Sequence, residues 1–384
     1  MNATPPIPEN APRLDPEEIL TGILEWVAIE SPSNDGGAVS AMVDRVASDF
    51  YALGFPLQRE SGRDGYGDIL TARTPWGDDG PGILVLCHVD TVHPLGTLDG
   101  PLSPRREGDK VYGPGIYDMK GGAYLAFSAL RHLVRLGERT PLPVTVMFVP
   151  EEEAGSPISR EAIEQAARAS KYVLVTEPAR AGGKVVTARR GAARYTVRAL
   201  GRAAHSGLRH QDGRSAIREM ARQILRFEAL TDYVADVTCN VGLVSGGTGS
   251  NVVPAECRAE VDVRLPNPEA AKRICADIAA FEPYDPEVTL EISGGLNRPP
   301  YEKDAGIARL FAHAHRLAQE IGFELEDMKT GGGSDGNFTA ALGVPTLDGL
   351  GVDGDGAHQP DEHLYVSSLL PRTRLLLGLL RTLR

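Results

Sequence analysis

Three segments of the sequence place histidine or acidic residues at the end of a short apolar run. They are His88 after GILVLC at 82–87, Glu151, Glu152 and Glu153 after VTVMFV at 144–149, and Glu177 after YVLV at 172–175. Imidazole nitrogens and carboxylate oxygens bind zinc, and a carboxylate can also accept a proton from an attacking water. Since parallel strands bring their carboxyl ends to one edge of a sheet, the three segments are expected to meet there.

His88 and Asp90 are two residues apart on an extended segment, so their side chains are expected on the same side of the chain. A carboxylate behind a ligating imidazole fixes its tautomer and raises its basicity. Asp90 is therefore expected to orient His88 rather than to bind metal. A strand end with an incidental histidine is the alternative for this motif alone.

Asp118 and the acidic run each have two interpretations. Asp118 lies in the tight segment YGPGIYDMKGG, where a carboxylate can bridge two cations or, alternatively, cap a helix. Three adjacent carboxylates at 151–153 are usually an exposed turn, but their position after a buried strand indicates a positive charge nearby. One of them can then bind metal while its neighbour faces the attacking water.

Buried parallel strands separated by helices are expected to position these residues. The three apolar runs are short and rich in β-branched residues, and helical patterns at 119–137 and 159–170 separate them. Two further helices precede the strands, one starting at Asp15-Pro16 and one ending at Gly54. The sequence predicts an α/β catalytic domain with a mostly parallel layered sheet and helices on both faces.

From about residue 190 the pattern changes to alternating strands. Strands are expected at 192–199, 236–244 and 257–264, and helices near 211–229 and 267–281. Two strands, a helix, two strands and another helix would form a small antiparallel α+β domain. We assign this inserted domain to 189–301 and the catalytic domain to 1–188 and 302–384, because helix and strand signals of the first type return after 302.

The charge, the apolar runs and the cysteine spacing limit which partners and which cellular compartment are expected. The 384 residues carry a formal net charge of −12, and no cluster of Lys and Arg stands out, which argues against a nucleic-acid partner. Neither a secretory signal nor a run of about 18 apolar residues is recognised, and the four cysteines lack CxxC spacing. We expect a cytoplasmic protein that binds no membrane.

Seven motifs occur in the order found in the dinuclear zinc aminoacylase/carboxypeptidase metallopeptidase family. They are HVDTV, GPGIYDMKGG, EEEAGS, TEP, GRAAHSG, TGGGSD and GAHQPDE. They extend over most of the chain and look most like the bacterial glutamate carboxypeptidase branch. The resemblance implies two zinc ions per subunit, with cobalt or manganese as alternative metals.

The resemblance also implies a role for each residue of the metal site. The ligands would be His88 and Glu177 for one zinc ion, Glu153 and His358 for the other, and Asp118 as a bridge between them. Glu152 would be the general base, and Asp90 would orient His88. The assignment of His358 rather than His363 follows from the GAHxPDE pattern.

The inserted domain, by the same resemblance, would act as a lid and as the surface of a homodimer. Its His205 would stabilise the oxyanion in its own or the partner's site, whereas a turn histidine without that role is the alternative. Asn251 and Arg264 resemble substrate-binding positions, and Arg264 can pair bidentately with a carboxylate. The loop containing Gly332 and Gly333 could receive an anion on its N–H groups, or serve only as a flexible connector.

These expectations together predict hydrolysis of an amide bond next to a free carboxylate, releasing a C-terminal amino acid. Removal of an acetyl or succinyl group from an N-acyl amino acid is the alternative reaction. A non-catalytic, metal-stabilised binding protein is the alternative from another class.

Overall fold

The computed structural model describes residues 13–77 and 80–384, which form two compact units. The first contains the described residues up to Thr187 with Lys303–Met328 and Ser334–Arg384, and the second contains Ala188–Glu302 and Lys329–Gly333. The ranges expected from the sequence differ in placing Ala188, Glu302 and 329–333 with the catalytic domain. The segment belongs to the second unit because Arg189 donates to the carbonyls of Gly332 and Gly333, at 3.1 and 3.2 Å.

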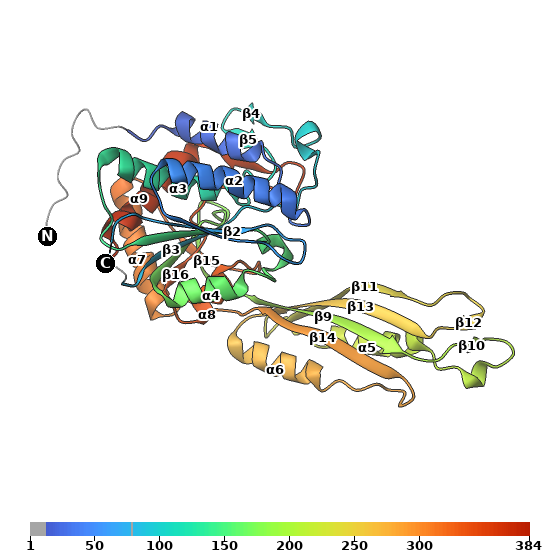
Figure 1. The fold of residues 1–384 in the computed structure, drawn as a ribbon. Helices are drawn as coiled ribbons and strands as arrows, with labels where there is room; N and C mark the ends of the chain where they lie inside the picture. Colours follow the sequence, from blue (N-terminus) through green and yellow to red (C-terminus); the bar gives the residue numbers. More distant parts are fainter. Residues whose placement is uncertain (1–12, 78–79) are drawn as a thin grey trace. The chain divides into compact units, whose positions relative to one another are not determined.

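A six-stranded sheet forms the centre of the first unit (Figure 1). Its strands, in spatial order, are β1 Leu57–Glu60, β2 Ile69–Arg73, β6 Val144–Val149, β3 Gly82–His88, β7 Ser170–Val175 and β16 Thr346–Leu347. The last four are mutually parallel, whereas β1 and β2 join antiparallel at one edge. The expected mostly parallel sheet is confirmed.

Helices cover both faces of this sheet, as predicted. One face carries α1 Pro16–Val27, α2 Gly36–Ala52, α3 Lys120–Leu136, α7 Ala305–Ile321 and α9 Val366–Thr382, and the other carries α4 Arg160–Arg168 and α8 Gly336–Ala341. Alternate residues of β3 show why both faces need cover. Val85 belongs to the larger apolar core, Leu84 to the smaller one, and both are buried.

The predicted helix boundaries lie close to the observed ones. Asp15 caps α1 by accepting the N–H of Glu17, and Asp35 caps α2 by accepting the N–H of Ala38. Gly54 adopts a φ of 77° just beyond α2, in the left-handed region that glycine occupies without strain.

A second sheet in the first unit was not predicted from the sequence. It contains β17 Gly354–Asp355, β18 His363–Tyr365, β5 Lys110–Tyr112 and β4 Arg105–Glu107, in that order. The short strands give little periodic signal. Their pairing brings the segment before Asp118 and the segment around His358 together, because Tyr112 pairs with His363.

The second unit is an antiparallel four-stranded sheet with two helices. Its strands lie in the order β11 Thr238–Gly246, β13 Glu256–Leu265, β9 Gly191–Leu200 and β14 Thr289–Arg298, and its helices are α5 Ala216–Glu228 and α6 Pro268–Ala279. Side chains of α5 and α6 pack in one core with alternate residues of β9, such as Tyr195 and Val197. The small α+β domain is thus present.

The order of elements in this unit differs from the prediction. Two strands were expected before the first helix, but only one strand of the sheet, β9, precedes α5. A further strand, β14, follows α6, where no strand was expected. β14 was missed because its segment TLEISGGLNR is mostly outside the core and contains Gly294 and Gly295, both with positive φ.

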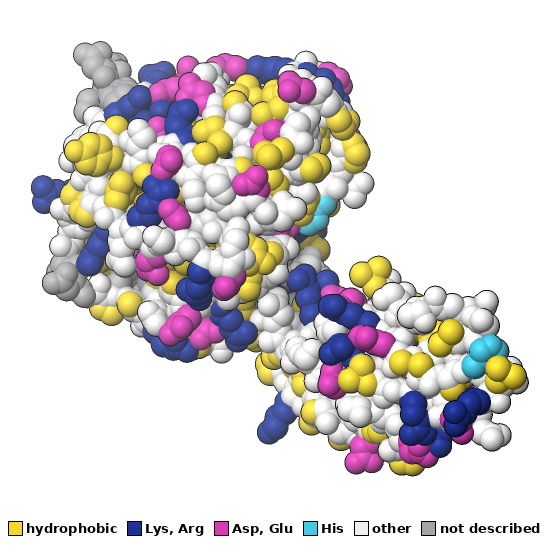
Figure 2. Space-filling model, turned by 45° about the vertical axis from the view of Figure 1, so that its right-hand side comes forward, with side chains coloured by type: hydrophobic (Ala, Val, Ile, Leu, Met, Phe, Trp, Pro, Cys, Tyr) yellow, Lys and Arg dark blue, Asp and Glu magenta, His cyan; other side chains and the backbone are white. Residues whose placement is uncertain are grey.

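The remaining strands are short. They are β8 Val185–Arg189 with β15 Asp327–Thr330, and β10 Ala204–His205 with β12 Val252–Val253. Figure 2 shows acidic and basic side chains intermixed over the visible face of each unit. Within 13–77 and 80–384, no helix is long and apolar enough to cross a membrane.

Candidate metal centre

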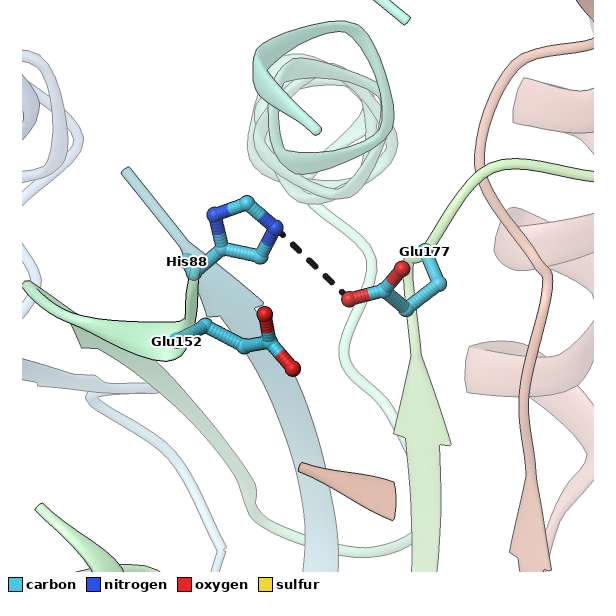
Figure 3. A group of neighbouring side chains, drawn as sticks. All are labelled: His88, Glu152 and Glu177. Atoms are coloured by element: carbon cyan, nitrogen blue, oxygen red, sulfur yellow. Dashed lines mark ion pairs between the residues drawn. The ribbon is translucent and has the colours of Figure 1, made fainter. Parts of the chain in front are cut away.

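Three adjacent parallel strands deliver the central residues of the site. His88 is the last residue of β3, Glu177 follows β7, and Glu152 begins the short 3-10 helix Glu152–Ala154 after β6. Figure 3 shows the side chains of His88, Glu152 and Glu177 directed into a common space. The Nε2 atom of His88 lies 3.6 Å from a carboxylate oxygen of Glu177.

Asp118 lies between the two histidines of the cluster. One of its oxygens is 3.2 Å from Nε2 of His88, and the other is 3.5 Å from Nε2 of His358. His358 is also 3.1 Å from the carboxylate of Glu153. The structure therefore brings all five predicted ligands into one group, although they come from five separate segments of the chain.

Asp90 is fully buried and contacts several segments of the metal site. Its carboxylate accepts the N–H groups of Glu152 and Glu153 at 3.1 and 3.2 Å and the hydroxyl of Ser33 at 2.6 Å. Nδ1 of His88 lies 3.0 Å from the backbone carbonyl of Asp90 and 3.3 Å from its carboxylate. Asp90 thus fixes the acidic run as well as the imidazole ring.

The three glutamates of the acidic run have different surroundings. Glu151 is buried and turns away from the cluster, because one of its oxygens accepts the N–H groups of Ile158 and Ser159 at 2.9 and 2.8 Å. Burial raises the pKa of Glu151 to about 7. Glu152 and Glu153 instead place carboxylate oxygens close to His88 and the other donor atoms.

Glu362 is a buried residue of the site that the sequence analysis did not single out. One of its oxygens accepts the N–H groups of Tyr117 and Asp118 at 2.9 and 3.0 Å, and the other accepts the N–H of Gly115 at 3.0 Å. His93 Nε2 lies 2.6 Å from that second oxygen. Glu362 could have been predicted, since it is the last residue of the GAHQPDE motif that contains His358.

The electrostatics of the cluster favour a bound cation. Burial alone would lower the pKa of His88, but the carboxylates around it, first Asp118 and then Asp90, raise it well above its usual range. Burial raises the pKa of Glu153, with the Asp118 carboxylate contributing. Carboxylates brought together in a buried site repel one another, and a positive charge relieves that repulsion.

The donor atoms also fit a zinc site. Two groups of side chains have their donor atoms within 4.8 Å of one another, and both groups include His88. The first group adds Glu152 and Glu177, and the second adds Asp118 and Glu153. Imidazole nitrogen and carboxylate oxygen are ordinary zinc ligands. Each histidine must lose its Nε2 proton to bind a cation, so protons and metal compete for the same atoms.

Within the second unit, the structure brings His205 and Asn251 side by side. His205 lies in β10, which pairs with β12, and Ser206 donates its N–H to the carbonyl of Asn251 at 3.0 Å. Nδ1 of His205 accepts the N–H groups of Gly207 and Leu208 at 3.1 and 3.2 Å. A neutral His205 therefore carries its proton on Nε2, which makes that atom a hydrogen-bond donor.

The other residues expected to bind substrate already have partners in the second unit. Arg264 makes a two-pronged ion pair with Asp262 on the same strand, with distances of 2.6 and 3.1 Å. Gly332 and Gly333 direct their carbonyls toward the guanidinium of Arg189. The glycine loop is thus anchored rather than a free connector.

Known proteins resemble this chain over nearly its full length. It is 31% identical over 361 residues to carboxypeptidase G2 of Pseudomonas sp. (strain RS-16), covering 92% of this chain and 86% of that protein. It is 26% identical to a succinyl-diaminopimelate desuccinylase of Azoarcus sp., covering 91% and 93%. The fold matches an M20 family metallo-carboxypeptidase from Sulfolobus solfataricus with a TM-score of 0.73, at 18% identity and with 96% and 99% of the two chains covered.

Residues 84–382 match the model of peptidase family M20/M25/M40. The matched range includes every residue of the cluster, and it extends through the second unit. The family predicted from the motifs and the predicted enzyme class are both confirmed. The chain belongs to peptidase family M20/M25/M40 and is a metal-dependent peptidase or amidohydrolase.

Proposed function

We propose that this enzyme is a carboxypeptidase that uses two zinc ions to release a C-terminal amino acid from an amide-linked substrate. The observation that carries the proposal is the position of Asp118, with one oxygen toward His88 and the other toward His358. A carboxylate so placed suits a bridge between two cations. The similarity to carboxypeptidase G2 over 92% of the chain supports the reaction class.

His88 and Glu177 would hold one zinc ion, and Glu153 and His358 would hold the other, with Asp118 shared. The contacts of 3.1 to 3.6 Å between the carboxylates and the Nε2 atoms support this division. Cobalt and manganese accept the same donor types, so metal analysis of the purified protein is the check on zinc.

Glu152 is proposed as the general base that takes a proton from the attacking water and passes it to the leaving nitrogen. Bound zinc ions would lower the pKa of that water and polarise the scissile carbonyl. Glu152 is suited to the proton transfer because its carboxylate lies among the donor atoms of His88 and Glu177. Asp90 contributes by fixing the backbone of Glu152.

Residues of the second unit are proposed to recognise the substrate, with that unit acting as a lid. Asp262 takes two of the five N–H donors of Arg264, and the others suit the free carboxylate of the substrate together with Asn251. The N–H groups of Gly332 and Gly333 would assist. His205, with Nε2–H as donor, would stabilise the oxyanion in its own or the partner's site.

A homodimer formed through the second unit is part of the proposal. β11 is an edge strand of its sheet, and its Leu243 and Val244 are 69% and 58% exposed. Leu225 on the neighbouring α5 is 72% exposed. An exposed apolar edge strand with an apolar helix face beside it is a surface that a second copy would cover.

Removal of a succinyl or acetyl group is the second candidate reaction. It is favoured by the 26% identity to a succinyl-diaminopimelate desuccinylase over 91% of the chain. The same cluster would cleave either amide, so the difference lies in the groups on each side of the bond. A non-catalytic binding protein is disfavoured because Glu152 and the five ligands are all present.

A substrate screen on zinc-loaded, metal-analysed protein tests the proposal. We expect hydrolysis of N-blocked dipeptides that end in a free carboxylate, and loss of hydrolysis when that carboxylate is amidated. Hydrolysis confined to N-succinyl or N-acetyl amino acids would support the deacylase instead. Tight binding with no hydrolysis across the panel would favour the binding protein.

A further inference from the structure

Two of the seven sequence motifs meet inside the first unit through a pair of buried residues. Ser156 is the last residue of the EEEAGS motif, and Asp335 is the last residue of the TGGGSD motif. The hydroxyl of Ser156 donates a hydrogen bond to the carboxylate of Asp335, although the two residues are 179 positions apart. Both residues are buried. The contact therefore ties the loop after β6 to the segment just before α8.

Ser156 also closes the turn that contains the acidic run. Its N–H donates to the carbonyl of Glu151 at 3.0 Å, and the N–H of Gly155 donates to the carbonyl of Glu152 at 2.7 Å. The backbone of Ser156 has a φ of 57°, in the left-handed region that residues other than glycine rarely adopt. Such a conformation persists only where surrounding contacts maintain it. The hydrogen bond to Asp335 is one of these contacts.

Glu152 lies between this turn and Asp90. On one side, the carboxylate of Asp90 accepts the N–H of Glu152 at 3.1 Å. On the other side, the turn ends at Ser156 and its contact with Asp335. The 3-10 helix Glu152–Ala154 between them is a single turn, and hydrogen-bond geometry in such helices is poor. The direction of the Glu152 side chain therefore depends on the contacts at both ends.

The segment that carries Asp335 is itself held by buried contacts. The N–H of Ser334 donates to the side-chain oxygen of Asn337 at 2.9 Å, and the hydroxyl of Ser334 donates to the carboxylate of Asp348 at 2.5 Å. Ser334, Asn337 and Asp348 are all buried. Asp335 thus offers Ser156 an acceptor in a fixed position.

We infer that Ser156 and Asp335 are positioning residues for Glu152. The inference rests on the proposed function, in which Glu152 takes the proton of the attacking water. The hydrogen bond keeps the turn closed, and the closed turn keeps the Glu152 carboxylate beside the donor atoms of His88 and Glu177. A displacement of about 1 Å near the reacting atoms can lower the rate about 10²-fold. Loss of the hydrogen bond should therefore lower kcat without weakening substrate binding.

The variants Ser156→Ala and Ser156→Gly test the inference on zinc-loaded, metal-analysed enzyme. Both remove the hydroxyl, and glycine adopts the backbone conformation of Ser156 without strain, so the second variant keeps the turn. With a cleaved N-blocked dipeptide as substrate, kcat should fall about tenfold or more in both variants. KM should stay within about twofold of wild type, with two zinc ions per chain. Wild-type kcat in Ser156→Gly, or a loss that disappears when zinc content is restored, would overturn the inference.

Ser128→Ala is the matched control for removing a buried hydroxyl. Ser128 lies on α3, and among the described residues its hydroxyl has no hydrogen-bond partner. Its variant should keep the kcat of wild type. A comparable loss of kcat in Ser128→Ala would mean that the effect at Ser156 is not specific to its contact with Asp335.

A double-mutant cycle tests whether Asp335 acts through Ser156. Asp335→Ala should lower kcat about as much as Ser156→Ala, and the double variant should be no slower than either single variant. Asp335→Asn keeps an acceptor oxygen for the hydroxyl, so it should retain more of the wild-type kcat than Asp335→Ala. Effects that multiply in the double variant would contradict a shared contact.

Glu152→Gln separates failure of this inference from failure of the proposed function. Loss of turnover in Glu152→Gln with wild-type kcat in both Ser156 variants would refute the positioning role alone. Wild-type turnover in zinc-loaded Glu152→Gln would instead refute the proposed base, and the positioning role with it.

Discussion

The metal cluster and the proposed substrate contacts differ in how firmly the fold holds them. Asp90 and Glu177 are buried, and Asp90 is bonded to segments far apart in the sequence. His205 and Asn251 are exposed and held mainly by backbone contacts of their own turns. The carboxylates of the cluster are held in place by buried contacts, whereas His205 and Asn251, proposed donors of the second unit, are exposed.

This difference follows from the free-energy cost of burying a charged group away from water. A buried carboxylate is stable only with partners in fixed positions, so each carboxylate of the cluster constrains the next, although His358 itself is exposed. An exposed histidine can form hydrogen bonds with water when no substrate is bound. Substitutions of the five proposed metal ligands should therefore change metal content, and substitutions in the second unit should change turnover alone.

The largest effect is expected for Asp118→Asn. Loss of the shared negative charge should reduce bound zinc below two ions per chain and lower kcat by about 10³-fold or more. Metal analysis and turnover on the same sample measure both quantities. Asp277→Asn, an exposed position on α6 with the same change of charge, is the control. Wild-type zinc content in Asp118→Asn would contradict the bridging role of Asp118.

His205→Ala should produce a smaller effect of a different kind. Removal of one oxyanion donor costs about 10²- to 10³-fold in kcat, and zinc content should stay at the wild-type level. His210→Ala tests an exposed histidine of the same unit and should retain wild-type kcat. The oxyanion role is wrong if both variants turn over alike.

Glu362→Gln should give the smallest loss. The amide keeps one acceptor oxygen but replaces the other with an NH₂ group, which meets the N–H of Gly115 and the His93 ring. Zinc affinity, measured by competition with a chelator, should fall about 10- to 100-fold. Glu269→Gln, exposed on α6, provides the control. Unchanged affinity would mean that Glu362 does not position Asp118.

The strand-end residues were predictable because their signal is local. Continuous apolar runs mark β3, β6 and β7, and His88, Glu152 and Glu177 follow these runs within three residues. Parallel strands then bring them together without further information. His358 has no such strand before it, so only its motif indicated it.

The features that were missed depend on pairing between distant segments. The contact of Glu362 with Asp118 spans 244 residues, and the short strands β5 and β18 that bring the two segments together have little periodicity. The ion pair of Arg264 with Asp262 is local, since the two residues lie two apart on one strand and share a face, and the sequence analysis did not consider it. The type of a residue shows which chemistry its side chain can perform. It does not show which hydrogen bonds and ion pairs that side chain makes in the folded protein.

The most direct test of metal-dependent hydrolysis with Glu152 as the general base is Glu152→Gln, measured for zinc content and turnover on one preparation. Glutamine keeps the size of the side chain and cannot accept the water's proton. We expect two zinc ions per chain, as in wild type, with kcat lowered by about 10²- to 10⁴-fold. Turnover within about threefold of wild type in a zinc-replete sample would contradict the role of Glu152 as the base.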